Sequence, residues 1–226
     1  TDLIVYSFDG SSLTLIDTKN HGNAAYSVSW SPDCRYLAVG GNNGSTDIIV
    51  YSFDGSLLTQ VTIKGHGAIA YSVSWSPDGR FLAVGGDNGS TDAIVYSFNG
   101  SSLIQNDSKD HGAEVYSVSW SPDGKYLAVG GSNGSSDLIV YAFDGFSLTQ
   151  IDTKSHGTYA RSISWSPDGM YVAVGGNNGT QDVIVYSFNG SSLFEIVSKA
   201  HGYYADSISW SPDGRYLAVG GYYGST

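Results

Sequence analysis

Hydrophobic and polar positions alternate along short segments of the chain, as residues 66–110 illustrate. Residues 71–75 (Tyr-Ser-Val-Ser-Trp) place apolar and small polar side chains in turn, which is the period-two pattern of a β-strand. Residues 81–84 and 92–98 are two further runs rich in β-branched and aromatic side chains, and residues 102–105 open a weaker fourth run. The segment is therefore predicted to form four antiparallel β-strands.

Turn signals separate these runs. The sequence Ser-Pro-Asp-Gly at residues 76–79 predicts a tight turn, because proline fixes φ, aspartate bonds nearby backbone and glycine accepts a positive φ. Residues 85–89 end the second strand, and Asn99-Gly100 is a hairpin dipeptide. In the equivalent turn at residues 31–34, Cys34 replaces the glycine of the other four copies, which we interpret as variation at a turn position. As the only cysteine of the chain, it excludes an internal disulfide.

The same pattern recurs five times with a period of 45 residues and without insertion or deletion. The recurring histidines are His21, His66, His111, His156 and His201. The recurring tryptophans are Trp30, Trp75, Trp120, Trp165 and Trp210. Four strands in about 45 residues is the size of one β-propeller blade.

The repeated unit resembles that of the WD-repeat β-propeller family along the whole chain. The residues that carry the resemblance are the histidine at each unit start, then Ser-Trp-Ser-Pro-Asp-Gly, Leu-Ala-Val-Gly-Gly and Ile-Val-Tyr. The resemblance implies a scaffold for protein interactions and a buried hydrogen-bond network from His to Trp. The chain departs from the family where Tyr51-Ser52 or Tyr141-Ala142 replaces the Trp-Asp dipeptide, and where the loop after the second strand is longer. An aspartate that recurs in every copy, as at Asp47 and Asp92, is the alternative partner of the histidine.

Alternation within the first strand of a unit predicts how blades pack. Val28 and Trp30 face one way, while Ser27 and Ser29 face the other. A bulky face that meets a small face on the next blade would give close packing.

We expect an all-β fold, a β-propeller of five four-stranded antiparallel blades, in a single domain over residues 1–226. Complete repeats occupy residues 21–65, 66–110, 111–155 and 156–200, and residues 201–226 together with 2–20 supply the two halves of the fifth. Pairing these halves within the chain would bury two exposed strand edges and close a ring. Pairing between chains, a segment of a longer array, and an engineered consensus are the alternatives.

Composition narrows the classes of partner. The chain has 21 Asp and Glu against 10 Lys and Arg, a formal net charge of −11, which disfavours nucleic acid and anionic membrane surfaces. No apolar stretch approaches the 18 residues or so of a membrane-spanning helix. We therefore expect neither a nucleic-acid nor a membrane partner.

Catalytic chemistry is not indicated. An enzyme needs a unique constellation of differently tuned groups, whereas nearly every His, Asp and Trp here occurs five times. The chain lacks the metal-binding His-Glu-x-x-His and the phosphate-binding Gly-Lys-Ser/Thr motifs. We therefore predict no catalytic residue, no cofactor and no metal, and assign structural roles to the repeated His and Trp, Asp47 and Asp92. Five histidines ringing one position could bind a metal, but we favour a role within each blade.

The copies differ mainly in the segment after His-Gly and in the loop after Gly-Gly, which lie at the same end of an up-and-down blade. Loops on a rigid scaffold commonly carry binding, and Tyr and Arg are favoured at interfaces. The candidate binding residues are Tyr159, Arg161, Tyr203, Tyr204, Asp206, Tyr222 and Tyr223. Loop variation, or tyrosine packing across the closure seam, is the alternative interpretation.

The function expected from the sequence is that of a non-catalytic repeat scaffold. It would bind a protein or peptide partner through the loop face that carries the divergent residues. The alternatives are a lectin-like carbohydrate binder and a structural or engineered propeller without a ligand. Self-association through the split blade is a further expectation.

Overall fold

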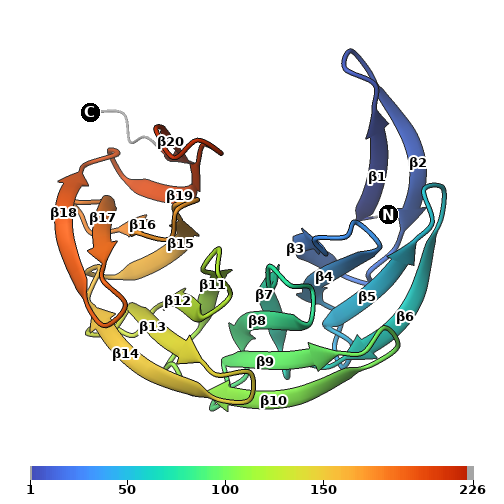
Figure 1. Ribbon diagram of the computed structural model, residues 1–226, viewed down its shortest axis with the longest axis horizontal. Coiled ribbons are helices and arrows are strands. Elements are labelled where there is room, and N and C mark those ends of the chain that lie inside the picture. The colour runs from blue at the N-terminus through green and yellow to red at the C-terminus, as the bar shows by residue number, and fades with distance from the viewer. Residues whose placement is uncertain (1, 223–226) are drawn as a thin grey trace.

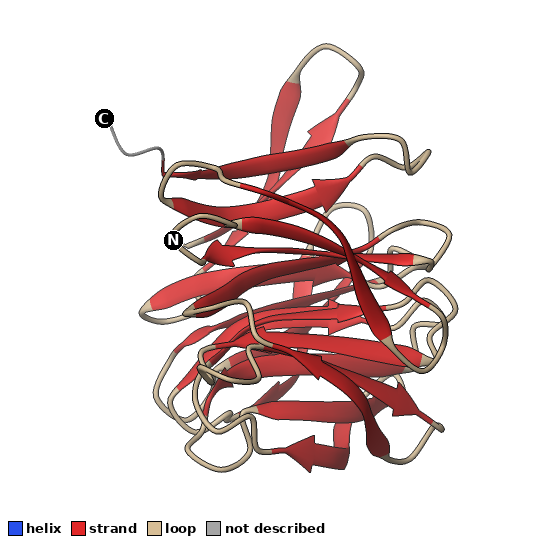
Figure 2. Cartoon of the chain, turned by 90° about the vertical axis from the view of Figure 1, so that its left-hand side faces the viewer, coloured by secondary structure: helices blue, strands red, loops and turns tan. Residues whose placement is uncertain are grey.

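The computed structural model describes residues 2–222, and all the regular structure in this range is β-strand (Figure 2). The first ten strands are β1 (Leu3–Phe8), β2 (Leu13–Lys19), β3 (Ala24–Trp30), β4 (Tyr36–Asn42), β5 (Ile48–Phe53), β6 (Leu58–Lys64), β7 (Ile69–Trp75), β8 (Phe81–Asp87), β9 (Ala93–Phe98) and β10 (Leu103–Lys109). The next ten are β11 (Val115–Trp120), β12 (Tyr126–Gly131), β13 (Leu138–Phe143), β14 (Leu148–Lys154), β15 (Tyr159–Trp165), β16 (Tyr171–Asn177), β17 (Val183–Phe188), β18 (Leu193–Lys199), β19 (Tyr204–Trp210) and β20 (Leu217–Tyr222). The predicted all-β class is confirmed.

The strands form antiparallel up-and-down blades. Four sheets have four strands each, β3–β6, β7–β10, β11–β14 and β15–β18, in chain order from the inside of the arc to its outside (Figure 1). The predicted four-stranded antiparallel blade is confirmed. The turn between the first two strands of each blade follows the expected chemistry: in Ser76–Gly79 the amide of Gly79 donates to the carbonyl of Ser76, and the Ser76 hydroxyl donates to Asp78.

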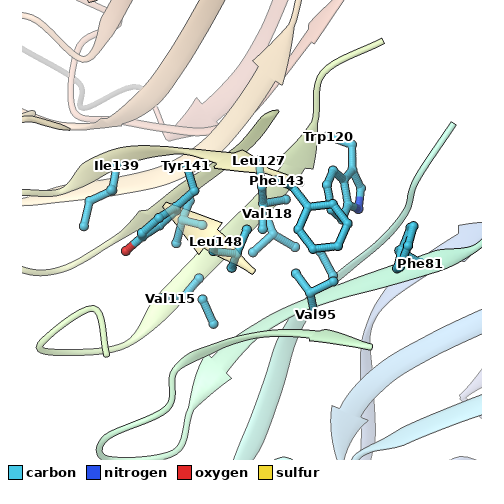
Figure 3. Close-up of a cluster of buried hydrophobic side chains, with 13 residues drawn as sticks. Phe81, Val95, Val115, Val118, Trp120, Leu127, Ile139, Tyr141, Phe143 and Leu148 are labelled. Atoms are coloured by element: carbon cyan, nitrogen blue, oxygen red, sulfur yellow. The ribbon is translucent and has the colours of Figure 1, made fainter. Parts of the chain in front are cut away.

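The hydrophobic core lies between neighbouring blades, as close packing of sheet on sheet requires. Trp120 and Val118 of one blade pack with Val95 and Phe81 of the blade before it (Figure 3). The predicted meeting of a bulky face with a small face is confirmed, because Val73 and Trp75 pack in one cluster with Ala38 of the blade before, where Oγ of Ser29 accepts from the backbone amide of Trp75.

The closed five-bladed ring that the sequence suggested is not observed. The sheets β1–β2 and β19–β20 remain separate two-stranded half-blades, and the described chain forms an open arc with these halves at its two ends (Figure 1). The reason is curvature. Each blade packs on the next through the same contacts, and the angle set at one junction, repeated along the arc, leaves β1 and β20 on opposite sides of the opening. A single domain over residues 1–226 stays a prediction.

Candidate functional site

The innermost strand of each blade carries a β-bulge at one repeat position. In β7 the ladder passes from Ala70 opposite Gly86 to Ser72 opposite Gly85, so that Tyr71 has no partner on β8. A bulge bends its strand and re-aims the extra side chain. The bulged residues of the five innermost strands are Tyr26, Tyr71, Tyr116, Arg161 and Asp206.

The bulged tyrosines approach one another from blade to blade. The ring centroids of Tyr26 and Tyr71 are 5.7 Å apart, and those of Tyr71 and Tyr116 are 5.5 Å apart. Tyr159, at the start of β15, continues the row at 6.1 Å from Tyr116. These four rings, together with Tyr204 at the start of β19, are called the tyrosine arc below. It follows the innermost strands, which border the central opening (Figure 1).

Arg161 lies where the other blades have tyrosine. Its guanidinium carbon is 5.5 Å from the ring centroid of Tyr159 and 4.9 Å from that of Tyr204, which are cation–π distances. Its Nη1 also donates to Oδ1 of Asp206, the bulged residue of the next blade, at 3.1 Å. Both side chains of this ion pair are exposed, so the pair positions the guanidinium more than it stabilises the fold.

Carboxylates make the surroundings of the arc electronegative. The hydroxyl of Ser132 donates to Oε2 of Glu114 at 2.8 Å, and hydrogen bonds to its own backbone amide and to Ser132 hold the pKa of Glu114 below its usual value. Burial, Tyr116, Asp87 and Glu114, in that order, raise the pKa of Tyr71. The arc therefore combines neutral aromatic faces with ionised carboxylates at pH 7.

The structure brings together most of the residues that the sequence singled out. Tyr159, Arg161, Tyr204 and Asp206 form the cluster just described. Tyr203 extends it, with its ring 4.3 Å from that of Tyr204 and 5.8 Å from that of Tyr222. Tyr223 lies outside the described residues. The two variable segments share one face as expected, because Tyr204 and Tyr222 are paired across β19 and β20.

Sequence reasoning missed Tyr26, Tyr71 and Tyr116. The signal was available in their 45-residue spacing, which Arg161 and Asp206 continue. These tyrosines lie in the variable segment after His-Gly, but the candidate binding residues come from the last two units, and the position of the tyrosines on a bulge is not visible in a hydrophobic pattern.

The repeated histidines lie where one blade passes into the next, and each backbone amide bonds an aspartate of the preceding blade rather than a group of its own blade, contrary to the expected role within each blade. His66 is buried, and its backbone amide donates to Oδ2 of Asp47 at 2.9 Å. The Oδ1 of the same carboxylate accepts from the amide of Asn43, so one buried aspartate joins two loops. The same pair recurs between His111 and Asp92. Burial lowers the pKa of the His66 imidazole, which keeps the ring neutral.

The same arrangement repeats along the arc. The other His–Asp pairs are His21 with Asp2, His156 with Asp137 and His201 with Asp182. In residues 2–222 no three His, Cys, Asp or Glu side chains are grouped as metal ligands would be. The repeated tryptophans lie at blade junctions, where the indole of Trp120, Trp165 or Trp210 donates to a serine carbonyl of the neighbouring blade.

Blade architecture and repeat place the chain among the β-propellers. Residues 101–223 match the family model described as the ELP1 first N-terminal beta-propeller, and residues 12–57 and 56–91 match the WD domain, G-beta repeat. The chain belongs to the WD-repeat β-propeller family, and the resemblance seen in the sequence is confirmed. No curated protein matches it in sequence.

Solved structures share the fold at low sequence identity. A protein described as a 6-phosphogluconolactonase from Bacteroides uniformis is 18% identical with a TM-score of 0.70, over 85% of this chain and 63% of that one. The periplasmic gluconolactonase of Pseudomonas aeruginosa is 20% identical with a TM-score of 0.81, over 96% and 69%. A chain of the Mitotic Checkpoint Complex is 22% identical with a TM-score of 0.65, over 96% and 81%. The chain thus spans less than two thirds of the first of these proteins.

These likenesses correct the expected function. The family resemblance and the loop residues that differ between copies predict a non-catalytic scaffold for a protein or peptide partner, with a lectin or a ligand-free propeller as alternatives. That inference is wrong, because two proteins that share the architecture are described as lactonases. WD-repeat propellers generally bind protein partners, so the fold itself carries both kinds of activity. In the described part of the chain, no helix is long and apolar enough to cross a membrane.

Proposed function

We propose that this chain is a binding protein whose ligand is a small organic cation, held on the tyrosine arc. The observation that carries the proposal is the position of Arg161, whose guanidinium lies over the rings of Tyr159 and Tyr204. The arc therefore already holds one cation, supplied by the protein itself. Tyr26, Tyr71 and Tyr116 present rings at the same repeat position on the three preceding innermost strands.

The geometry suits a cation in two ways. Adjacent rings are tilted by 53° between Tyr26 and Tyr71, and by 56° between Tyr71 and Tyr116, with centroids 5.7 and 5.5 Å apart, so the rings pack side by side and turn their faces in different directions. A quaternary ammonium group is attracted to such faces by the ring quadrupole. The ionised Glu114 beside Tyr116 and the net charge of −11 add a longer-range attraction.

The test is a titration with choline, monitored by NMR of the tyrosine rings and by calorimetry. The neutral isostere 3,3-dimethylbutan-1-ol is the matched ligand control, since it keeps the shape and removes the charge. We expect choline to bind more tightly by about 5-fold for each ring face, corresponding to about 1 kcal/mol per contact. Equal affinity for both ligands would contradict the proposal.

Variants locate the site. Tyr71→Leu and Tyr116→Leu are expected to weaken choline binding, whereas Phe146→Leu, at an exposed ring in the β13–β14 turn, should leave it unchanged.

Two further probes distinguish the proposed function from other functions. Hydrolysis of glucono-δ-lactone that is lost in Arg161→Ala would replace the proposal with an enzymatic one. A lysine-rich peptide that binds where choline does not would show a protein partner instead.

A further inference from the structure

A hollow of about 720 Å³ lies between the blade β7–β10 and the blade β11–β14. The turn at residues 76–79, which follows the end of β7, lines it, whereas Tyr71 of the tyrosine arc lies near the start of β7. The hollow and the arc are therefore at opposite ends of the strands. Its volume is typical of a small-molecule site. The equivalent residues at the next junction, between β11–β14 and β15–β18, enclose only about 260 Å³.

Phe81 explains the difference between the two junctions. The other four copies have tyrosine at this position. At the next junction the hydroxyl of Tyr126 donates to the carbonyl of Gly190, in the turn between β17 and β18, at 3.4 Å. A Cβ placed on Gly190 would meet this hydroxyl at 3.4 Å, whereas a Cβ placed on the equivalent Gly145 would meet no atom of the described residues within 4 Å, its own chain neighbours aside. Because Phe81 has no hydroxyl, the space beside the β13–β14 turn stays open.

Asn106 holds this turn in place of the missing hydroxyl. The other copies have an aliphatic residue at its position, namely Ile16, Val61, Ile151 and Ile196. Its Nδ2 donates to the carbonyl of Gly145 at 3.2 Å, which is the bond that a tyrosine makes at the next junction. Its Oδ1 accepts from the amide of Ser97 at 2.9 Å. The changes at Phe81 and Asn106 are thus complementary, since one opens the hollow and the other keeps its wall fixed.

A third change places an aromatic ring at the edge of the hollow. Phe146 lines it and is 78% exposed, while the other four copies have serine at this position. The amide of Phe146 donates to Oδ1 of Asp144 at 2.8 Å, which fixes the turn that carries the ring. Three lining residues therefore differ from the repeat at one junction, and together they form an open space with an exposed aromatic face.

The charges around the hollow favour a cation. Asp78, Asp123 and Asp144 line it, against one basic residue, Arg80. Asp123 forms an ion pair with Lys125 at 3.5 Å, but the guanidinium of Arg80 lies over an aromatic ring at 5.5 Å. Among residues 2–222 the structure shows no ion pair to Asp78 within 4 Å. This carboxylate is therefore left for a cationic ligand.

We propose that the hollow binds a protonated arylalkyl amine, with its ammonium group at Asp78 and its ring between Phe146 and the open space beside Phe81. The hydroxyl of Ser76 donates to Oδ1 of Asp78 at 2.6 Å and fixes the carboxylate, which can accept charge-assisted hydrogen bonds from an ammonium group. Aromatic rings favour an aromatic partner. Choline has neither a ring nor an N–H group, so this site goes beyond the proposed choline binding and is independent of it.

The first experiment titrates the chain with 2-phenylethylamine at pH 7, by calorimetry and by saturation-transfer NMR of the ligand ring. Two matched ligands divide the contacts: 3-phenylpropanoate keeps the ring and reverses the charge, and butylamine keeps the ammonium group and removes the ring. We expect 2-phenylethylamine to bind about 5-fold more tightly than either, the ratio that one lost contact of about 1 kcal/mol gives. Equal binding of 3-phenylpropanoate overturns the proposal, and so does a wild-type chain that does not bind the amine at millimolar concentration.

The second experiment gives this junction the residues of the other junctions. Phe81→Tyr, alone and together with Asn106→Ile, should fill the open space and abolish binding of 2-phenylethylamine, while urea unfolding checks that the variants are folded. Tyr126→Phe makes the reciprocal change at the next junction and is the matched control, which should leave amine binding unchanged. A folded Phe81→Tyr variant that binds the amine as wild type does overturns the proposal.

The third experiment separates this site from the tyrosine arc. Phe146→Ser and Asp78→Asn should each weaken binding of 2-phenylethylamine by about 5-fold and leave choline binding unchanged. Tyr71→Leu should weaken choline binding and leave amine binding unchanged. Amine binding that is lost in Tyr71→Leu and kept in Phe146→Ser would place the amine on the tyrosine arc and overturn the present proposal, while the proposed function would stand.

Discussion

The backbone amide of Val73 donates a hydrogen bond to Oγ of Ser27, 46 residues earlier and in the neighbouring blade, at 3.1 Å. The contact repeats along the arc, from Val118 to Ser72, from Ile163 to Ser117 and from Ile208 to Ser162. A small hydroxyl thus serves two purposes at each junction. It leaves room for the bulky face of the next blade, and it accepts from a backbone amide of the innermost strand, which is the edge strand of its sheet.

Removing this hydroxyl should destabilise the protein. Ser27→Ala leaves the amide of Val73 without its acceptor at a packed junction, and we expect a loss of about 1–3 kcal/mol in the free energy of unfolding. The matched control is Ser207→Ala, whose side chain is exposed on the last half-blade. In dilute solution the control should lie within about 0.5 kcal/mol of wild type by urea denaturation. Equal effects at both sites would show that the hydroxyl contact is not what stabilises the junction.

Two equivalent tryptophans provide a second internal comparison. Trp75 is 6% exposed and Trp30 is 41% exposed, although each packs edge-on against a phenylalanine of its own blade at 5.2 or 5.3 Å. They differ in whether a complete blade precedes them. Trp75→Ala should cost about 3–5 kcal/mol, and Trp30→Ala about half as much, because less surface is removed from contact. Thermal and urea unfolding of the two variants, side by side, measure the contribution of one blade junction. An unchanged melting temperature for Trp75→Ala would contradict the packing described here.

The blade was predictable from the sequence because its determinants are local. Alternation predicted a strand at residues 71–75, and β7 begins only two residues earlier, while the Ser-Pro-Asp-Gly turn follows from the conformations of its own residues. The open arc was not predictable. Closure depends on the angle between whole blades, and no hydrophobic pattern encodes an angle.

The candidate site was predictable only in part. Tyr159, Arg161 and Tyr204 stood out because the copies differ there. Tyr71 and Tyr116 did not, because a bulge decides where their rings point, and a one-residue shift of register is invisible to period-two alternation. The repeated tyrosines show that a side chain that recurs from blade to blade can also build a repeated surface.

Cys34 is the one non-glycine residue with positive φ among the described residues, at 59°. In the equivalent turns Gly79, Gly124, Gly169 and Gly214 each have a φ of 70°. A residue with a Cβ is strained by about 1–2 kcal/mol in this left-handed region, so Cys34→Gly should stabilise the protein by about 1 kcal/mol after the added freedom of the unfolded chain is subtracted. Gly79→Ala is the reciprocal variant and should destabilise it by a similar amount. Chemical denaturation under reducing conditions measures both, and a destabilised Cys34→Gly would show that the thiol makes a favourable contact.

Acid should destabilise the protein before its carboxylates titrate. Burial lowers the pKa of His21, His66, His111 and His156 below the ordinary 6.5, with nearby aspartates opposing the effect. Below pH 6.5 the unfolded chain therefore binds protons that the folded chain does not. By linkage, the stabilisation of the fold by neutral histidine rings is fully present above pH 6.5. It is lost as pH falls through the folded pKa values. The free energy of unfolding then decreases by up to about 1.4 kcal/mol per pH unit for each histidine.

Urea unfolding at pH 7.5, 6.5 and 5.5 measures directly the slope of the free energy of unfolding against pH. His66→Gln should reduce that slope by about a quarter, because it removes one of four equivalent groups. Asp9→Asn is the control: hydrogen bonds from the amides of Ser12 and Ser11 lower the pKa of this exposed carboxyl, so its contribution appears only below its ordinary value of 3.8. A stability that stays constant between pH 7.5 and 5.5 would mean that the folded histidines take up protons as readily as the unfolded ones. The buried His–Asp pairs would then have to accommodate charged imidazoles.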